Sequence, residues 1–392
     1  MQRCVTPSWF ITAIVALMAA GCTKVFGDAI LVPETDSETV NDTETAPDQT
    51  DDAPDAGFES DSDTVVAVDS DSEDEAILPA FIIGADISSI DEQEQSGVVF
   101  FDGDAEKDAL QILRDHGFNF ARLRLFHDPG KPDGYQFDDN ANRDAPYCDR
   151  DHTIRMAKRA KALGMGVFLA IHYSDTWADQ EEQSKPAAWT DLDFEDLAAQ
   201  VYTYTQDTLR AFENAGVLPE MVQVGNATTP GMLHPDGDIA NWDQLAALLK
   251  QGLTATKAVN PKIKTVLHLE RCNDTETSLE WFDAAVAHGV TFDIIGQTCY
   301  PAWHGAPSEW RETFLALADR YPTTDFIIAE YSYEKSAANE VVHELPDTRG
   351  LGAFLWEPTS LMEQIFDYEG MRAYTNDLID VYDALAETLL AD

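Results

Sequence analysis

Short apolar runs alternate with longer helical patterns from Phe81 onward, and this alternation constrains the fold more than any other feature of the chain. Strands that alternate with helices are typical of βαβ units, which build parallel sheets. The candidate strands number eight, as in a (β/α)8 barrel. They span Phe81–Ile87, Asn119–Phe126, Gly166–His172, Met221–Asn226, Lys264–Leu269, Phe292–Tyr300, Asp325–Tyr331 and Leu351–Trp356.

The segments between these strands carry helical periodicity and stop signals. A glycine follows or ends three of them, and an amphipathic leucine stripe in the fourth stops before Pro261. These predicted helices are Asp104–His116, His152–Leu163, Asp193–Gly216 and Trp242–Val259.

An open, doubly wound sheet would show the same alternation, but the predicted strand ends favour a barrel. In (β/α)8 barrels, the catalytic residues lie at the carboxyl ends of the strands. Polar residues stand there in this chain: Asp86, Arg122, Arg124, His172, Asn226, Glu270, Tyr300, Glu330 and Glu357. No glycine-rich phosphate loop follows any strand, which disfavours a nucleotide-binding sheet. We therefore predict an α/β fold, a (β/α)8 TIM barrel, over residues 79–392.

The first residues are typical of a targeting segment. Arg3 precedes an apolar run from Trp9 to Ala20, and small residues lead into Cys22, a pattern that resembles the lipobox of bacterial lipoproteins. The resemblance implies a lipoprotein signal peptide over residues 1–21, lipidation of Cys22, and an exported protein anchored to the bacterial cell envelope by lipid alone. An ordinary cleaved signal or a short uncleaved anchor are the alternatives, although the apolar run is short for a membrane span.

Residues 22–78 form an acidic segment with few large apolar side chains, and no Lys, Arg or His occurs between Lys24 and Lys107. Such a segment buries too little apolar surface to offset its ordering entropy. We predict a disordered tether with a reach of about 40 Å. Binding of cations or partners is the alternative.

The overall charge balance limits the partners of the chain. It has 25 Lys and Arg against 72 Asp and Glu, a formal charge of −47. Phosphate backbones are bound by cationic side chains, so we expect no nucleic acid partner.

Three cysteines remain after Cys4 and Cys22 are set aside, namely Cys148, Cys272 and Cys299. Because three is an odd number, no disulfide framework can be read from the sequence, and whether any of the three cysteines pair stays open. We expect a monomer.

A long motif follows the third predicted strand. His172-Tyr-Ser-Asp175-Thr-Trp177-Ala-Asp179 is followed by Gln183, Lys185-Pro186 and Trp189. Shorter motifs accompany the other strands: Asp86 on strand one, Arg122-Leu-Arg124 on strand two, Tyr300-Pro301 and Trp303 after strand six, and Trp356-Glu357-Pro358 after strand eight. The motifs and their order along the chain resemble those of the arabinogalactan endo-β-1,4-galactanases of glycoside hydrolase family 53.

The resemblance implies a barrel enzyme that acts on the β-1,4-galactan of type I arabinogalactan. Retaining glycosidases use two carboxyl groups about 5 to 5.5 Å apart. Glu330 stands where the family has its nucleophile, although a carboxylate paired with Arg122 or Arg124 for stability is the alternative. Asn226 would contact the sugar 2-hydroxyl, and Asp86, Arg124, His172 and Asp175 would shape the site. No cofactor and no metal are expected.

The acid/base position departs from the family. After strand four the family has Gly-Asn-Glu, whereas this chain has Gly225-Asn226-Ala227. Alanine cannot transfer a proton, and losing acid/base assistance costs about 10² to 10⁴ in rate. We therefore expect impaired turnover, or a galactan-binding surface lipoprotein without catalysis. Glu270 and Asp179 are candidate replacement acids.

Two accounts of Ala227 are open, a laboratory substitution and natural divergence. The second is favoured, because His234 and Phe126 stand where tryptophan is expected and Cys299 where tyrosine is expected.

Aromatic rings are expected to stack on the sugars, since pyranose faces pack on them. The candidates are Trp177, Trp189, Tyr300, Trp303 and Trp356. Packing in the core or loops is the alternative for each.

Overall fold

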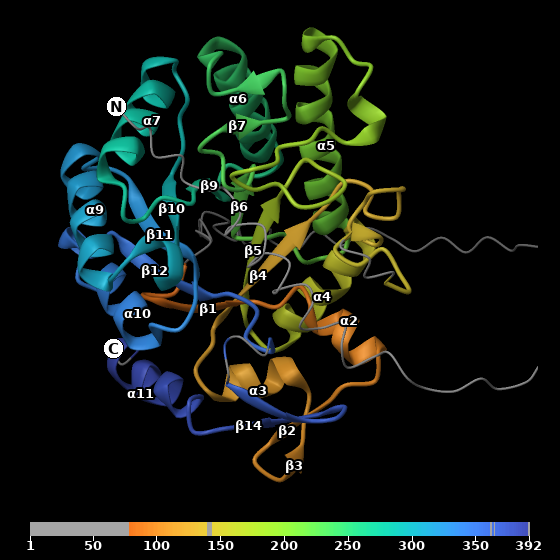
Figure 1. The fold of residues 1–392 in the computed structure, drawn as a ribbon, viewed down its shortest axis with the longest axis vertical. Helices are drawn as coiled ribbons and strands as arrows, with labels where there is room; N and C mark the ends of the chain where they lie inside the picture. The colour runs from red at the N-terminus through yellow and green to blue at the C-terminus, as the bar shows by residue number, and fades with distance from the viewer. Residues whose placement is uncertain (1–77, 139–142, 361–362, 364, 391–392) are drawn as a thin grey trace, which may run out of the picture.

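A closed barrel of eight parallel strands forms the centre of the molecule (Figure 1). The computed structural model describes residues 78–138, 143–360, 363 and 365–390. The strands are β1 (Ile82–Asp86), β4 (Phe120–Leu125), β5 (Gly166–Ile171), β6 (Met221–Val224), β9 (Lys264–Leu269), β10 (Ile294–Cys299), β11 (Asp325–Tyr331) and β12 (Gly350–Leu355). Since β12 pairs with β1 in parallel, the barrel closes. The predicted TIM barrel is confirmed.

Large and small side chains alternate inside the barrel. Nine buried side chains form the interior cluster: Ile82, Phe120, Phe168, Met221, Val266, Ile294, Ile327, Ala329 and Phe354. A Cβ at Gly84 would lie 2.2 Å from the Phe354 ring, and one at Gly166 would lie 2.1 Å from the Phe120 ring. Glycine at these two positions therefore lets the large rings fill the barrel.

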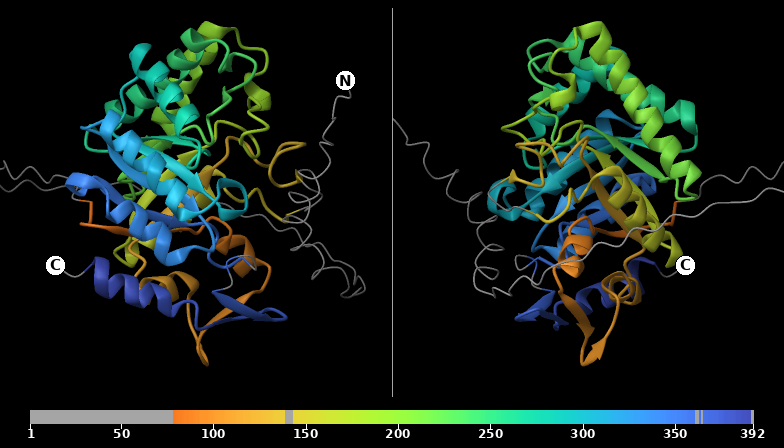
Figure 2. Two further views of the ribbon diagram at one scale, coloured as in Figure 1. Left: turned by 60° about the vertical axis from the view of Figure 1, so that its left-hand side comes forward. Right: turned by 90° about the vertical axis from the view of Figure 1, so that its right-hand side faces the viewer.

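Helices cover the outside of the barrel, as the views in Figure 2 show. They are α2 (Ile90–Gln95), α3 (Ala109–Asp115), α4 (Arg150–Ala162), α5 (Phe194–Asn214), α6 (Trp242–Val259), α7 (Thr275–Ala287), α8 (Pro301–His304), α9 (Pro307–Arg320), α10 (Lys335–His343) and α11 (Asp380–Leu389). Aspartate or asparagine side chains cap α3, α4, α5, α6 and α7 by accepting backbone N–H bonds. The predicted helices that became α4, α5 and α6 are confirmed within two residues at each end.

The predicted helix Asp104–His116 is wrong in its first turn. Residues Ala105–Glu106 form strand β3, and the helix α3 begins only after its cap Asp108. β3 belongs to a four-stranded sheet with β2 (Val99–Asp102), β14 (Arg372–Thr375) and β13 (Phe366–Glu369), which lies beside α3 and α11 in Figure 1. The parallel pairing of β2 with β14 joins segments far apart in sequence, so no local pattern predicted it.

One disulfide joins Cys272, in the loop after β9, to Cys299 at the end of β10. The odd cysteine count gave no sign of this pair. The third cysteine, Cys148, is a buried free thiol. Burial raises the pKa of its thiol to about 12.

The predicted signal peptide, Cys22 and all but the last residue of the predicted tether lie outside the described residues. Within the described ranges, no helix has both the length and the apolar composition to cross a bilayer.

Candidate active site

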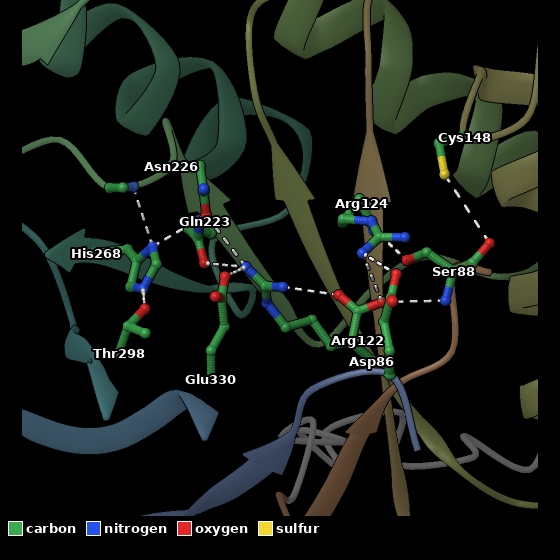
Figure 3. Close-up of polar contacts among 12 residues, drawn as sticks. Asp86, Ser88, Arg122, Arg124, Cys148, Gln223, Asn226, His268, Thr298 and Glu330 are labelled. Carbon is green, nitrogen blue, oxygen red and sulfur yellow. Dashed lines mark hydrogen bonds and ion pairs between the residues drawn. The ribbon is translucent and has the colours of Figure 1, made fainter. Parts of the chain in front are cut away.

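The guanidinium of Arg122 is the centre of a polar network at the carboxyl ends of the barrel strands (Figure 3). Its Nη1 donates to Asp86 Oδ2 at 2.7 Å, and its Nη2 donates to Glu330 Oε1 at 2.8 Å. The Arg122 side chain is fully buried, and those of Asp86 and Glu330 are 1 % and 9 % exposed. One cation thus pairs with both buried carboxylates, and Arg124 Nη1 lies 3.9 Å from the other oxygen of Asp86.

Glu330 enters this network through an irregularity in β11. The pairing of β11 shifts register between Ile328 and Tyr331 against β12, and between Gln297 and Thr298 of β10. Strict alternation would send neighbouring side chains to opposite faces, yet Ala329 packs in the barrel interior and Glu330 contacts Arg122. The extra residue therefore directs Glu330 toward the barrel axis.

A second carboxylate contact fixes the orientation of Glu330. Tyr300, at the end of β10, donates its hydroxyl to Glu330 Oε2 at 2.7 Å. Burial raises the pKa of Glu330, whereas Arg122 and the Tyr300 hydroxyl act to lower it. Burial, together with the Glu330 charge, holds the pKa of the Tyr300 hydroxyl well above its usual value. Tyr300 therefore remains a proton donor in its hydrogen bond to Glu330.

Asn226 lies on the same side of Arg122 as Glu330, since Nη2 donates to both, and three hydrogen bonds hold its amide. Its Oδ1 accepts from Arg122 Nη2 at 3.2 Å and from Gln223 Nε2 at 2.9 Å. Its Nδ2 donates to the carbonyl of Ala178 at 2.9 Å. His268 Nδ1 lies 3.0 Å from Asn226 Oδ1. The side chain predicted to contact a sugar hydroxyl is therefore held in a single amide orientation.

Arg124 occupies a neighbouring position between two tryptophan rings. Its guanidinium carbon lies 4.7 Å from the ring centroids of both Trp177 and Trp356, within the range of cation–π attraction. Its Nη1 donates to Glu357 Oε1 at 2.7 Å, whereas its Nε and Nη2 find no hydrogen-bond partner within the described residues.

His172 packs beside this cluster, 6.1 Å between ring centroids from Trp177. Burial and the two arginines hold its pKa well below the usual value, so the ring is neutral near pH 7. Nδ1 accepts the backbone N–H of Ala178 at 3.2 Å, which places the proton on Nε2. Nε2 is buried and has no partner among the described residues.

Ala227 follows Asn226 in a backbone conformation that is uncommon for alanine, with φ of 46°. Its N–H lies 3.2 Å from His268 Nδ1. Gln183 Nε2 donates to the carbonyls of Asn226 and Ala227, at 2.9 and 3.1 Å. Neighbouring side chains therefore fix the backbone at the position where the resemblance implies the family's acid/base glutamate.

Some of the predicted site residues lie apart from this network. Asp175 Oδ1 faces His127 Nδ1 and accepts the Asp128 N–H, while Oδ2 accepts the Ala187 N–H. Asp175 therefore holds the loop rather than facing the Glu330 network. Trp189 is 2 % exposed, packed against His127 and Tyr204, so it belongs to the core and offers no stacking face. Trp303 is 44 % exposed and packs edge-on to Tyr300.

The two candidate replacement acids have different environments. Asp179 is exposed, and its Oδ1 closes a turn by accepting the N–H groups of Glu181 and Glu182. Glu270 is 7 % exposed, and its Oε2 accepts the Thr229 hydroxyl at 2.9 Å. Burial raises the pKa of Glu270.

Several polar residues of the network were not predicted as site residues: Arg122, Gln223, His268, Thr298 and Glu357. Arg122, His268 and Glu357 stand at or near strand ends and were visible in the sequence. Gln223 could have been found from alternation, since it lies one residue beyond the buried, outward-packed Val222. Among the described residues, no group of three or more His, Cys, Asp or Glu side chains is placed to hold a metal ion.

A further buried carboxylate, Glu363, lies in the segment after β12. It is 2 % exposed, and its Oε2 lies 3.3 Å from Lys335 Nζ and accepts the Tyr333 N–H at 3.2 Å. Burial raises the pKa of Glu363 to about 7, because desolvation of the carboxylate outweighs the attraction of Lys335.

This raised pKa predicts a pH-dependent stability. Between about pH 4.5 and 7 the folded chain retains a proton that the unfolded chain has released, so the free energy of unfolding falls as pH rises through this window. The free energy of unfolding falls by at most about 1.4 kcal/mol per pH unit, or by ~3 kcal/mol over the whole window. Urea unfolding at pH 5 and 7.5 should show a smaller pH difference for Glu363→Gln than for the parent. Equal differences for the two proteins would contradict the assignment.

Carboxylates, an amide and aromatic rings at the mouth of a (β/α)8 barrel define a site of the glycoside hydrolase class. The model of glycosyl hydrolase family 53 matches residues 82–340. The chain therefore belongs to glycosyl hydrolase family 53, and it is a galactanase-like glycoside hydrolase by its relatives.

Three similar proteins illustrate the relationship. An arabinogalactan endo-beta-1,4-galactanase of Humicola insolens is 30 % identical over 311 residues, which cover 70 % of this chain and 88 % of that protein. An uncharacterized Niallia circulans protein from the bgaB 5' region is 39 % identical over 251 residues, 62 % of this chain but only 65 % of that protein. The GH53 catalytic domain of Ignisphaera aggregans has a TM-score of 0.71 at 30 % identity, covering 80 % of this chain and 98 % of that one.

Proposed function

We propose that this chain binds the β-1,4-galactan of type I arabinogalactan at the Glu330 site and cleaves it slowly or not at all. The observation that carries this proposal is the contrast between Glu330, held by both Arg122 and Tyr300, and Ala227, which follows Asn226 of the same network. The nucleophile position keeps its supporting contacts, whereas position 227 offers only a methyl group. The names of the curated relatives support galactan as the substrate class.

In the proposed mechanism, the Glu330 carboxylate attacks the anomeric carbon and forms a glycosyl-enzyme ester, as in retaining glycosidases. Arg122 and Tyr300 orient the attacking carboxylate, and Asn226 hydrogen-bonds the 2-hydroxyl. The leaving sugar oxygen must then depart without a proton, which is costly for an alkoxide. Trp177 and Trp356 are half-buried rings that can stack on a sugar, and the buried Arg124 guanidinium packs between them.

Leaving groups that need no proton should bypass the missing acid. With a dinitrophenyl β-galactobioside, Glu330 can displace the phenolate directly, so we expect a burst of one phenolate per protein followed by a slow phase. The slow phase reflects water attack without a general base. Azide attacks the anomeric carbon of the glycosyl-enzyme without a base, displaces the Glu330 carboxylate and forms galactobiosyl azide, so it should raise the slow rate at least about ten-fold.

Stopped-flow absorbance of the phenolate tests this expectation. Glu330→Gln is the control, because it keeps the size of the side chain but cannot form the ester. A burst that survives Glu330→Gln would show that another residue is the nucleophile.

Natural divergence explains Ala227 better than a single engineered change. The other departures from the family pattern are embedded in their own local contacts. Cys299 pairs with Cys272, Phe126 packs against His172 and Trp177, and His234 bonds the Pro230 carbonyl. A site that diverged naturally and lost its acid fits a capture role, which is the second candidate function. In that role, galactan is retained at the site without release of product.

The location of the protein is part of the same proposal. We propose that residues 1–21 direct export, that Cys22 carries lipid, and that the acidic segment spaces a monomeric barrel from the cell envelope. Metabolic labelling with an alkyne fatty acid should mark the parent and not Cys22→Ser. Equal labelling of the two would exclude Cys22 as the lipidated residue.

A further inference from the structure

Exposed aromatic side chains gather on the face of the barrel that carries Glu330. Among the described residues, the large apolar side chains that are most exposed include three aromatic rings, those of Phe137, Trp303 and Tyr333. Each lies in a segment that leaves the carboxyl end of a barrel strand, namely β4, β10 and β11. The remaining members of this exposed set are aliphatic, on the outer helices, the small sheet and the approach to α11: Val99, Val286, Leu315 and Leu378.

Tyr333 is the most exposed of the three, at 50 %, and it follows Glu330 by three residues. Its φ is 62°, a left-handed conformation that is costly for a side chain of this size. Two tight backbone contacts shape the turn: Glu334 N–H donates to the Ser332 carbonyl at 2.8 Å, and Lys335 N–H donates to the Tyr333 carbonyl at 2.7 Å. A strained residue that presents a large apolar ring to solvent gives no stability through burial, so its placement calls for another reason.

The turn that carries Tyr333 is held by a buried ion pair. Glu363 Oε2 accepts the Tyr333 N–H and lies within 3.3 Å of Lys335 Nζ. The Lys335 and Glu363 side chains are only 7 % and 1 % exposed. Desolvating two charges is costly, so a buried pair need not add net stability, and in this chain we assign the pair to fixing local geometry. Here that geometry is the backbone of an exposed tyrosine next to the nucleophile.

We propose that Tyr333 is a sugar-stacking residue, positioned by the Lys335–Glu363 pair, that binds one further galactose unit of the chain held at Glu330. The apolar C–H face of a neutral pyranose packs on an aromatic ring, and the hydroxyls remain in water at an exposed rim. The proposal rests on the proposed function, because the ring contributes only to a polymer already bound at Glu330. Tyr333 is thereby a binding residue and Glu363 a positioning residue.

Calorimetric titration of the full chain with β-1,4-galactotetraose tests the binding role. Tyr333→Ala should weaken binding roughly three- to ten-fold, and Tyr333→Phe should bind like the parent because it keeps the ring. Leu315→Ala is the matched control, since Leu315 is 45 % exposed on α9, and it should bind like the parent. Parent-like binding by Tyr333→Ala would overturn the stacking role while leaving galactan binding intact. A parent that fails to bind the tetraose would overturn the proposed function and this inference together.

A double-mutant cycle tests the positioning role of Glu363. Glu363→Ala should weaken binding by a factor similar to that of Tyr333→Ala, whereas Glu363→Gln, which keeps an acceptor oxygen for the Tyr333 N–H, should retain affinity. In the Tyr333→Ala background, Glu363→Ala should cause no further loss, because the ring it positions is absent. A full additional loss in that background would show that Glu363 supports the site in general and would overturn the positioning role.

Discussion

Replacing Ala227 with glutamate is expected to raise the rate of galactan cleavage by about 10² to 10⁴ over the parent, because it supplies a general acid and base opposite Glu330. The backbone at 227 is already fixed by Gln183 and faces His268, so the substitution changes the side chain without demanding a new loop conformation. Reducing-end release from galactan at equal protein concentration measures the gain.

Two variants separate acid catalysis from other effects. Ala227→Gln matches the size of glutamate but cannot transfer a proton, and it should remain as slow as the parent. Ala227→Glu combined with Glu330→Gln should also be inactive, because the nucleophile is absent. A parent that cleaves at a rate comparable to that of Ala227→Glu would contradict the missing-acid account. Loss of that parental activity in Glu270→Gln would then identify Glu270 as the acid.

Replacing Arg122 with methionine is expected to lower the free energy of unfolding by about 3 to 5 kcal/mol. The substitution leaves Asp86 and Glu330 buried without the cation that contacts both, at 2.7 and 2.8 Å. Urea unfolding at pH 7 measures the effect. At lower pH the loss should shrink, since protonated carboxyl groups no longer need the counter-charge.

Arg210→Met is the matched control for this experiment. Arg210 pairs with Glu213 on α5, but both side chains are more than a third exposed, so the loss should stay within about 1 kcal/mol. Equal losses for the two variants would show that the Arg122 network has no special role in stability.

The barrel could be predicted from the sequence because each βα unit carries its own local signal. Apolar strand runs, capping aspartates and terminal glycines are visible within a window of about 20 residues. The sheet formed by β2, β3, β13 and β14 could not be predicted, since the pairing of Val99 with Arg372 depends on the closed barrel bringing distant segments together. The start of the predicted helix Asp104–His116 was wrong for the same reason, because β3 belongs to this sheet.

Site residues could be predicted where the residue type itself implies a chemical role. They could not be predicted where burial determines whether a side chain faces the site or packs in the core. Glu330 and Asn226, which the motif and the strand ends predicted, both contact Arg122 in the structure. Asp175 and Trp189 belong to the same motif, yet the first bonds loop backbone and the second packs in the core. Glu363 lies outside any motif. Its role depends on the N–H of Tyr333, which the sequence alone could not place.

The closing strand of the barrel lies beyond the segment that the family model matches. That match ends at residue 340, whereas β12 spans Gly350–Leu355 and pairs with both β11 and β1. A gene fragment trimmed to the recognisable segment would encode a barrel with an unpaired seam, and two rows of backbone N–H and C=O groups would be left open to other chains. For expression and for the assembly of chimeras, the folding unit is therefore longer than the segment that the family model matches, and it must include β12.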